Sequence, residues 1–197
     1  MRRRIRLPGV ACFIFFVFLV SASCWGEEAR PFSLEGVEFL SGYGAGDLRL
    51  KKDYRVVPFF ADFDFRLKPL LARKNIHFPG LLQFIIEPFF SYVTGPDKNV
   101  EVGNNFLIKI GLFPEGWTLQ PYIKGGAGFL YMSQHTLEEG TQFNFNECIG
   151  AGMHYFFRKN AALTLEYRYR HLSNCDIKLP NGGIDSDFVI GGISFLF

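Results

Sequence analysis

Residue types that together hydrolyse esters gather near the C-terminus of this chain. His171 and Ser173 are two positions apart, and Asp185 and Asp187 follow after a short polar segment. A serine hydroxyl becomes an effective nucleophile when a histidine accepts its proton, and a carboxylate beside the histidine fixes its tautomer and stabilises the imidazolium. These residue types therefore indicate acyl transfer through a serine, provided that the fold brings them to one surface.

The spacing of this pair has a structural consequence if the segment is a strand. Side chains two positions apart on a strand share a face and lie about 6.5–7 Å apart. His171 and Ser173 must therefore lean together to share a proton, so we expect a local irregularity there. If Ser173 pairs with Asp185 across a hairpin, Asp187 lies opposite His171, and either aspartate could be the acid of the triad.

The elements that must position these residues are strands, because the hydrophobic pattern from Phe32 onward has a period of two. Each predicted strand is long enough to cross a bilayer when tilted, which takes about 9–11 residues. The predicted strands are 33–44, 53–66, 80–93, 100–113, 117–132, 141–157, 161–173 and 185–197.

The seventh predicted strand shows what its two faces carry. One face is aromatic and leads to His171 and Ser173, whereas the other carries charged residues that we expect to form an interior network. His154 is expected to be a packed interior residue, and His77 and His135 to lie in loops. The first face holds Leu163, Leu165, Tyr167, Tyr169, His171 and Ser173, and the second holds Thr164, Glu166, Arg168 and Arg170.

Strand length and composition favour a membrane barrel over a soluble one. The strands exceed the usual 5–6 residues, and their polar faces are rich in glycine, which suits a narrow interior filled by side chains. The chain ends in an alternating aromatic strand whose last residue is Phe197; this ending resembles the signal that the barrel-assembly machinery reads. The fold class expected is all-β, an eight-stranded antiparallel transmembrane β-barrel, and the alternative is a soluble lipocalin-like barrel.

The N-terminus predicts export. Arg2, Arg3, Arg4 and Arg6 precede an apolar segment too short to span a membrane, and small residues follow it. We expect a signal peptide over residues 1–23, with cleavage as late as residue 26, and the barrel over residues 27–197. The alternatives are an uncleaved anchor and a lipoprotein attached through Cys24.

Composition and residue spacing argue against a nucleic-acid-binding protein and against a metalloprotein. The chain is 48% hydrophobic and 17% aromatic, and its positive net charge belongs to the N-terminal arginines. We therefore expect no nucleic-acid partner. Cys148 is expected on a strand and Cys175 in an outer loop, so no disulfide is required, and the spacing of the cysteines and histidines predicts no metal site and no cofactor.

An even number of strands with a periplasmic N-terminus predicts the sidedness of the loops. Connections after the first, third, fifth and seventh strands face outward, and those after the second, fourth and sixth face the periplasm. The segment 67–79 is longer than a periplasmic turn usually is. His171 and Ser173 are thereby expected at the outer end of the last hairpin, on the face that meets lipid.

The longer pattern around these residues resembles a known family. His171-Leu-Ser173-Asn174 is followed at matching spacing by Pro180-Asn181-Gly-Gly183-Ile184-Asp185. This segment is similar to the lipid A 3-O-deacylases, the PagL-type acyl hydrolases of the outer membrane. The resemblance implies that His171 is the general base, Ser173 the nucleophile, Asn181 a contributor to the oxyanion hole and Asn174 a supporting residue. The family usually has Glu at the position of Asp185, so Asp187 stays open as the acid.

The resemblance also implies a substrate. The expected function is hydrolysis of the ester-linked hydroxyacyl chain at the 3-position of lipid A, in the lipopolysaccharide of the outer leaflet. The alternatives are an esterase that acts on phospholipid and a non-enzymatic barrel with a structural or adhesive role. The sequence does not indicate an oligomeric state, an acyl-chain preference or latency in the native membrane.

Overall fold

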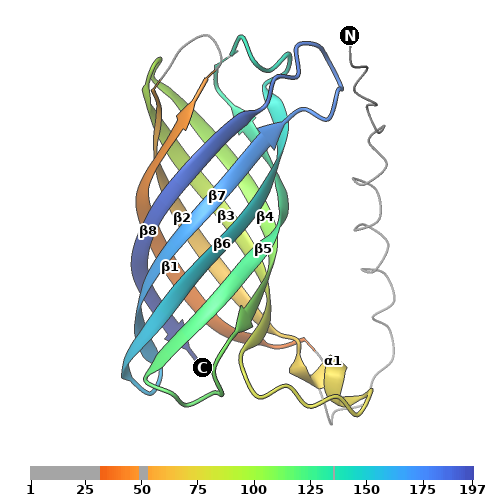
Figure 1. The fold of residues 1–197 in the computed structure, drawn as a ribbon, viewed down its shortest axis with the longest axis vertical. Helices are drawn as coiled ribbons and strands as arrows, with labels where there is room; N and C mark the ends of the chain where they lie inside the picture. Colours follow the sequence, from red (N-terminus) through yellow and green to blue (C-terminus); the bar gives the residue numbers. More distant parts are fainter. Residues whose placement is uncertain (1–31, 49–52, 135) are drawn as a thin grey trace, which may run out of the picture. The chain divides into compact units, whose positions relative to one another are not determined.

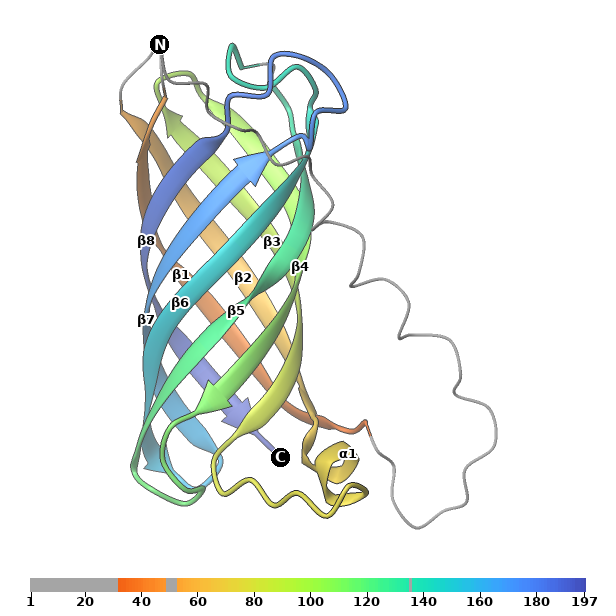
Figure 2. The ribbon, with the colours of Figure 1, turned by 45° about the vertical axis from the view of Figure 1, so that its right-hand side comes forward.

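The computed structural model describes residues 32–48, 53–134 and 136–197, and this part of the chain forms a closed antiparallel barrel (Figure 1). Each strand pairs with the strands before and after it in the sequence, and β1 closes the barrel against β8. Figure 2 shows the same tilted strands from a second side. The strands are β1 (Leu34–Asp47), β2 (Tyr54–Arg66), β3 (Leu82–Gly95), β4 (Asn99–Gly111), β5 (Leu119–Met132), β6 (Phe143–Arg158), β7 (Ala161–Ser173) and β8 (Ile184–Leu196).

The predicted fold class and all eight predicted strands are confirmed, with ends that differ by a few residues. The period of two is what made this possible, because it assigns each side chain to one side of the wall. In β2 the side chain of Phe63 is 37% exposed, whereas the next residue, Asp64, is 1% exposed. A soluble barrel has the opposite arrangement, with apolar residues inside. The predicted segment 1–23 and the cysteine at position 24 lie outside the described residues.

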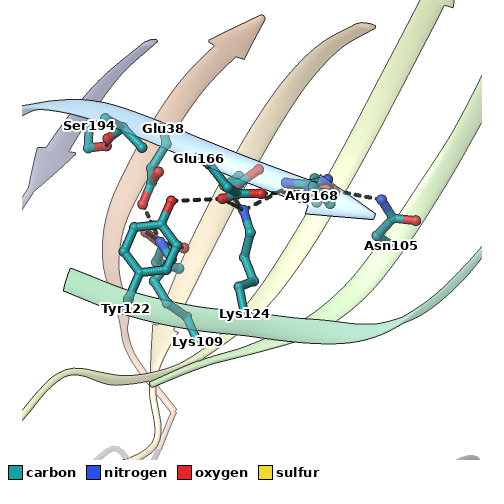
Figure 3. Close-up of polar contacts among 12 residues, drawn as sticks. Glu38, Asn105, Lys109, Tyr122, Lys124, Glu166, Arg168 and Ser194 are labelled. Atoms are coloured by element: carbon teal, nitrogen blue, oxygen red, sulfur yellow. Dashed lines mark hydrogen bonds and ion pairs between the residues drawn. The ribbon is translucent and has the colours of Figure 1, made fainter. Parts of the chain in front are cut away.

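The interior of the barrel is filled by ion pairs. Lys124 on β5 contacts the Glu166 carboxylate at 2.9 Å, and the Nε of Arg168 donates to the same carboxylate at 2.7 Å (Figure 3). Lys109 on β4 pairs with Glu38 on β1 across the lumen. Because burying a charge is costly unless it is paired, these residues specify which strands face one another.

Strand β7 is fixed from the inside at two successive inward positions. Arg168 donates from Nη1 and Nη2 to the two oxygens of Glu87 on β3, at 2.7 and 2.8 Å. Arg170 donates to Glu101 on β4 at 2.8 Å. The expected interior network of Glu166, Arg168 and Arg170 is confirmed. It matters for the site because the outward residues of β7 alternate with these anchors.

The two ends of the barrel differ in their connections. The long β2–β3 connection contains a single short helix, α1 (Lys68–Ala72), which has a proline in its first turn. Proline is favoured there because a backbone N–H in the first turn would have no acceptor within the helix, so its absence costs nothing. Within the described residues, no helix is long and apolar enough to cross a membrane. The opposite end carries the β5–β6 loop (residues 133–142) and the β7–β8 loop (residues 174–183), which lie side by side in Figures 1 and 2.

The predictions for the two cysteines of the barrel, for His154 and for His77 are also confirmed. Cys148 is buried, Cys175 is exposed, and both are free thiols. His154 is 2% exposed and its Nδ1 lies 2.8 Å from Thr164 Oγ1. His77 lies in the β2–β3 connection, and residue 135 is outside the described part of the chain.

Candidate functional site

The register of the β7–β8 hairpin decides which acid faces the histidine. His171 is the direct cross-strand partner of Asp185, and Tyr169 is the partner of Asp187. The ladder ends one pair later, at Leu172 and Ile184, so the register in which Ser173 would pair with Asp185 does not occur, and it differs from the observed one by two residues. The physical reason is the β7–β8 loop, which begins its turn directly after Ser173 and leaves that residue beyond the last pair.

The imidazole and the carboxylate form a hydrogen bond on the outside of the barrel. His171 Nδ1 lies 2.6 Å from Asp185 Oδ1, with the two side chains 40% and 61% exposed. The hydroxyl of Tyr169 donates to the same oxygen at 2.6 Å. Asp187 accepts from Tyr167 instead. The structure therefore brings His171 to Asp185 and places the alternative acid, Asp187, against a tyrosine.

Ser173 continues the outward face of β7 beyond His171. It pairs with Phe145 of β6. The β6–β7 ladder is regular from this pair to the pair of Phe156 with Ala162, so the irregularity expected between His171 and Ser173 is absent from this ladder. Among the contacts of the described residues, no hydrogen bond joins the Ser173 hydroxyl to the imidazole. The two side chains thus have the spacing of a regular strand, and their polar atoms must come closer before they can share a proton.

The loop that follows Ser173 is built around Asn174. Its backbone N–H donates to Asn181 Oδ1 at 2.9 Å, and its Nδ2 donates to the carbonyls of Lys178 and Pro180 at 2.8 and 3.0 Å. Asn174 is fully buried. Cys175 next to it has a φ of 54°, a left-handed conformation that turns the chain sharply. Asn174 therefore holds the turn of this loop, and the supporting role in catalysis that the resemblance implies stays a prediction.

Asn181 is held inside the same loop. Its Oδ1 accepts from Asn174, and its Nδ2 donates to Asp176 Oδ1 at 2.9 Å. An amide nitrogen carries two hydrogens, so one N–H of Asn181 is used within the loop and one is left for a ligand. The predicted oxyanion contact of Asn181 is compatible with this arrangement through that second hydrogen.

Gly183 packs directly against the imidazole. Its φ is 74°, and a Cβ placed on it would lie 2.8 Å from His171 Cε1. Both observations exclude a side chain here, because L-residues rarely adopt this conformation and real Cβ atoms do not approach so closely. The absence of a side chain at position 183 is therefore what lets the loop backbone lie next to the Cε1 edge of the imidazole.

Two further acidic residues lie beside this cluster, and neither of them was named in the sequence analysis. Glu147 on β6 is the other cross-strand partner of His171, and it is exposed on the outward face. Glu139 in the β5–β6 loop is 1% exposed and accepts a hydrogen bond from the Gly183 N–H. Alternation along β6 could have placed Glu147 on the outer surface. No local pattern predicts Glu139, because its contact joins two separate loops.

The groups that could hold a metal ion lie elsewhere in the described barrel. Glu38, Asp62 and Asp64 place one oxygen each within 4.8 Å of one another in the lumen. Lys109 pairs with Glu38 and Asp64, and Lys124 pairs with Asp62 at 3.1 Å. These ammonium groups already supply the positive charge that the carboxylates need, and the cluster lies on the opposite side of the wall from His171.

Comparison with known protein families shows to which family this barrel belongs. Residues 64–193 match the family model described as lipid A 3-O-deacylase (PagL). The chain belongs to the lipid A 3-O-deacylase (PagL) family. The matched range contains β7, β8 as far as Ile193, and every residue of the cluster around His171. Membership indicates a bacterial outer-membrane β-barrel with lipid A deacylase activity, as the sequence resemblance predicted.

Solved structures agree with the fold. The crystal structure of the outer membrane enzyme PagL is similar with a TM-score of 0.58 and 19% identity, over 81% of this chain and 98% of that one. Neisserial surface protein A is similar with a TM-score of 0.63 and 14% identity, over 87% of this chain and 100% of that one. At these identities the likeness shows the barrel alone. No curated protein sequence matches the chain.

Proposed function

We propose that this barrel is a serine esterase that removes the ester-linked hydroxyacyl chain from the 3-position of lipid A. One observation carries the proposal: His171 and Asp185 are hydrogen-bonded on the lipid-facing surface, with Ser173 next along the same face. Polar groups that face lipid are costly unless they serve one another or a ligand. A His–Asp pair beside a serine at the rim of the membrane is suited to an ester that lies in the membrane.

The proton would move through the imidazole. Because Nδ1 of His171 is engaged by Asp185, Nε2 is the atom left to accept the hydroxyl proton of Ser173 as its oxygen attacks the ester carbonyl. The carboxylate of Asp185 stabilises the imidazolium that forms. His171 then gives the proton to the departing sugar oxygen, and a water molecule activated by His171 releases the acyl group from Ser173.

The negative charge on the carbonyl oxygen would be met by N–H groups of the β7–β8 loop. Asn181 has one amide hydrogen left after its bond to Asp176, and the buried hydrogen bonds of Asn174 hold the backbone that carries it. Donors fixed before the reaction cost no reorganisation in the transition state. Asn181 therefore stabilises the oxyanion, and Asn174 positions the loop.

The outer surface below the site suits acyl chains. Tyr167 and Val189 are 54% and 60% exposed, and apolar residues continue along the same faces of β7 and β8. In the proposed sidedness, the end of the barrel with the β7–β8 loop faces the outside of the cell. The acyl chains of an outer-leaflet lipid then lie along this surface, with their ester linkages at the level of Ser173.

A defined assay tests this function. Purified barrel in detergent micelles is incubated with lipid A or with a diacyl phospholipid, and the released acids are measured by mass spectrometry. The proposal expects free 3-hydroxy acid from lipid A with wild type and none with Ser173→Ala. Release from phospholipid alone would favour the phospholipase alternative, and no release from either lipid by folded wild type would support the non-enzymatic barrel.

A further inference from the structure

The β5–β6 loop and the β7–β8 loop are joined by their main chains. Glu139 and Asn181 form a single antiparallel bridge. The N–H of Gly140 donates to Pro180 O at 2.6 Å, and the N–H of Gly182 donates to Glu138 O at 2.7 Å. The loop that carries Asn181 is thus docked on a neighbouring loop by contacts that need no side chain.

The side chain of Glu139 adds a separate contact beneath this junction. Its Oε1 accepts from the N–H of Gly183 at 2.8 Å, and the residue is 1% exposed. Its Oε2 is buried and, among the described residues, has no hydrogen-bond partner. A buried carboxyl is costly, so its presence calls for a reason beyond joining the loops.

The contact leads directly to the imidazole. Gly183, which Glu139 holds by its N–H, is the residue that approaches His171 Cε1 so closely that no Cβ fits. On its other side the imidazole is held by Asp185 through Nδ1. His171 is therefore confined between a carboxylate that orients Nδ1 and a glycine whose position depends on a second, buried acid.

We propose that Glu139 is a positioning residue for His171, acting through Gly183. The inference rests on the proposed esterase function. The accepting oxygen of Glu139 holds the Gly183 backbone against the edge of the imidazole, so that Nε2 stays aimed at the side of the strand where Ser173 lies. Because Gly140 and Gly182 join the loops independently, loss of this oxygen leaves the loops docked and loosens Gly183.

The proposal makes different demands on different replacements of Glu139. Glu139→Gln keeps an oxygen that can accept from Gly183, so it should retain turnover close to wild type. Glu139→Ala removes the acceptor, and Glu139→Asp withdraws it by one methylene. Each should lower kcat by about 10- to 100-fold, because the lost hydrogen bond is one to a charged group and its loss frees Gly183 to move away from His171. KM should stay within about threefold, because Glu139 does not contact substrate.

The experiment measures kcat and KM of the full-length mature barrel on lipid A in micelles, for wild type and the three variants. Glu115→Ala is the matched control, because that acid pairs with Lys68 at the opposite end of the barrel. Folding is checked by the shift in gel mobility that folded barrels show before heating. Low kcat in Glu139→Asp with near-normal kcat in Glu139→Gln would support the proposal.

Three results would overturn it. Wild-type kcat in Glu139→Asp and Glu139→Ala would show that Gly183 needs no acceptor. Equal loss in Glu139→Gln and Glu139→Asp would show that something other than the accepting oxygen matters. A rise in KM with unchanged kcat would place Glu139 in substrate binding. Inactive, folded wild type would instead refute the proposed function, and this inference with it.

Discussion

Nδ1 of His171 lies 2.6 Å from Oδ1 of Asp185, its direct partner across the β7–β8 ladder. Asp187 is one outward position further along β8, where it accepts from Tyr167. The two aspartates look equivalent in the sequence because they share a face of the strand. The register separates them, so that one acid holds the imidazole and the other holds a tyrosine.

Replacement of the two aspartates should therefore have very different effects. Asp185→Asn keeps the shape but lets the imidazole take the wrong tautomer, so kcat should fall by about 10³- to 10⁴-fold. Asp187→Asn should change kcat by less than about threefold, because its bond to Tyr167 lies away from the imidazole. Steady-state hydrolysis of lipid A by the two purified variants measures both. A larger loss of kcat in Asp187→Asn than in Asp185→Asn would show that Asp187, and not Asp185, is the acid that serves His171.

Tyr169 should contribute a smaller effect through the same acid. Its hydroxyl donates to Asp185 Oδ1 at 2.6 Å, so Tyr169→Phe removes a hydrogen bond that orients the carboxylate. A hydrogen bond to a carboxylate is worth about 1.5–3 kcal/mol net, and since Asp185 keeps its direct bond to His171, about 1 kcal/mol of this reaches the imidazole, a fall in kcat of about fivefold. Tyr167→Phe is the matched control, since it loses an equivalent bond to Asp187. Equal kcat values in the two variants would speak against a role for Tyr169.

Gly183 offers a test of the packing against His171. Gly183→Ala should lower kcat by at least about tenfold, because the new methyl meets the imidazole and must displace it or the loop. Gly116→Ala is the control for backbone strain: its φ is 91°, but nothing lies within 4 Å of the added Cβ. Kinetics and gel mobility of both variants separate the two effects. Loss of activity in both variants alike would mean that strain alone is responsible.

The period of two predicted more of this molecule than any motif did. It assigned Arg168 to the lumen and Tyr167 to lipid, because alternation is a geometric property of every strand. It could not give the register of His171 and Asp185, which depends on how many residues the β7–β8 loop uses to turn. That loop has left-handed backbone at Cys175 and Asp176; aspartate adopts this conformation more readily than most residues, but a cysteine gives no signal for it.

The contact between Glu139 and Gly183 was still harder to predict from the sequence. It joins a loop residue to Gly183 across a long separation in the chain, and no local pattern signals such a contact. The family resemblance named residues on one hairpin, whereas the structure adds support from a neighbouring loop. Residues that position others are harder to predict than residues that react, because their chemistry is ordinary and only their placement is specific.

The ionisation of Glu139 predicts a pH dependence for the docked loop. Burial raises the pKa of this carboxyl above its ordinary value of 4.5. The folded loop then holds a proton that the open loop would release, so docking should weaken as pH rises from the ordinary pKa through the raised one. Hydrogen exchange of the Gly183 amide, corrected for its intrinsic rate, should accelerate over that interval in wild type. Glu139→Gln should remove this dependence, and a dependence unchanged by the substitution would contradict the assignment.

The most direct test of the central claim is mass spectrometry of lipid A from cells that express the barrel. The account predicts that wild type lowers the mass of lipid A by one ester-linked hydroxyacyl chain, whereas Ser173→Ala and His171→Ala, inserted at equal levels, leave the mass unchanged. An unchanged lipid A profile with correctly inserted wild type, or the same loss with Ser173→Ala, would contradict it.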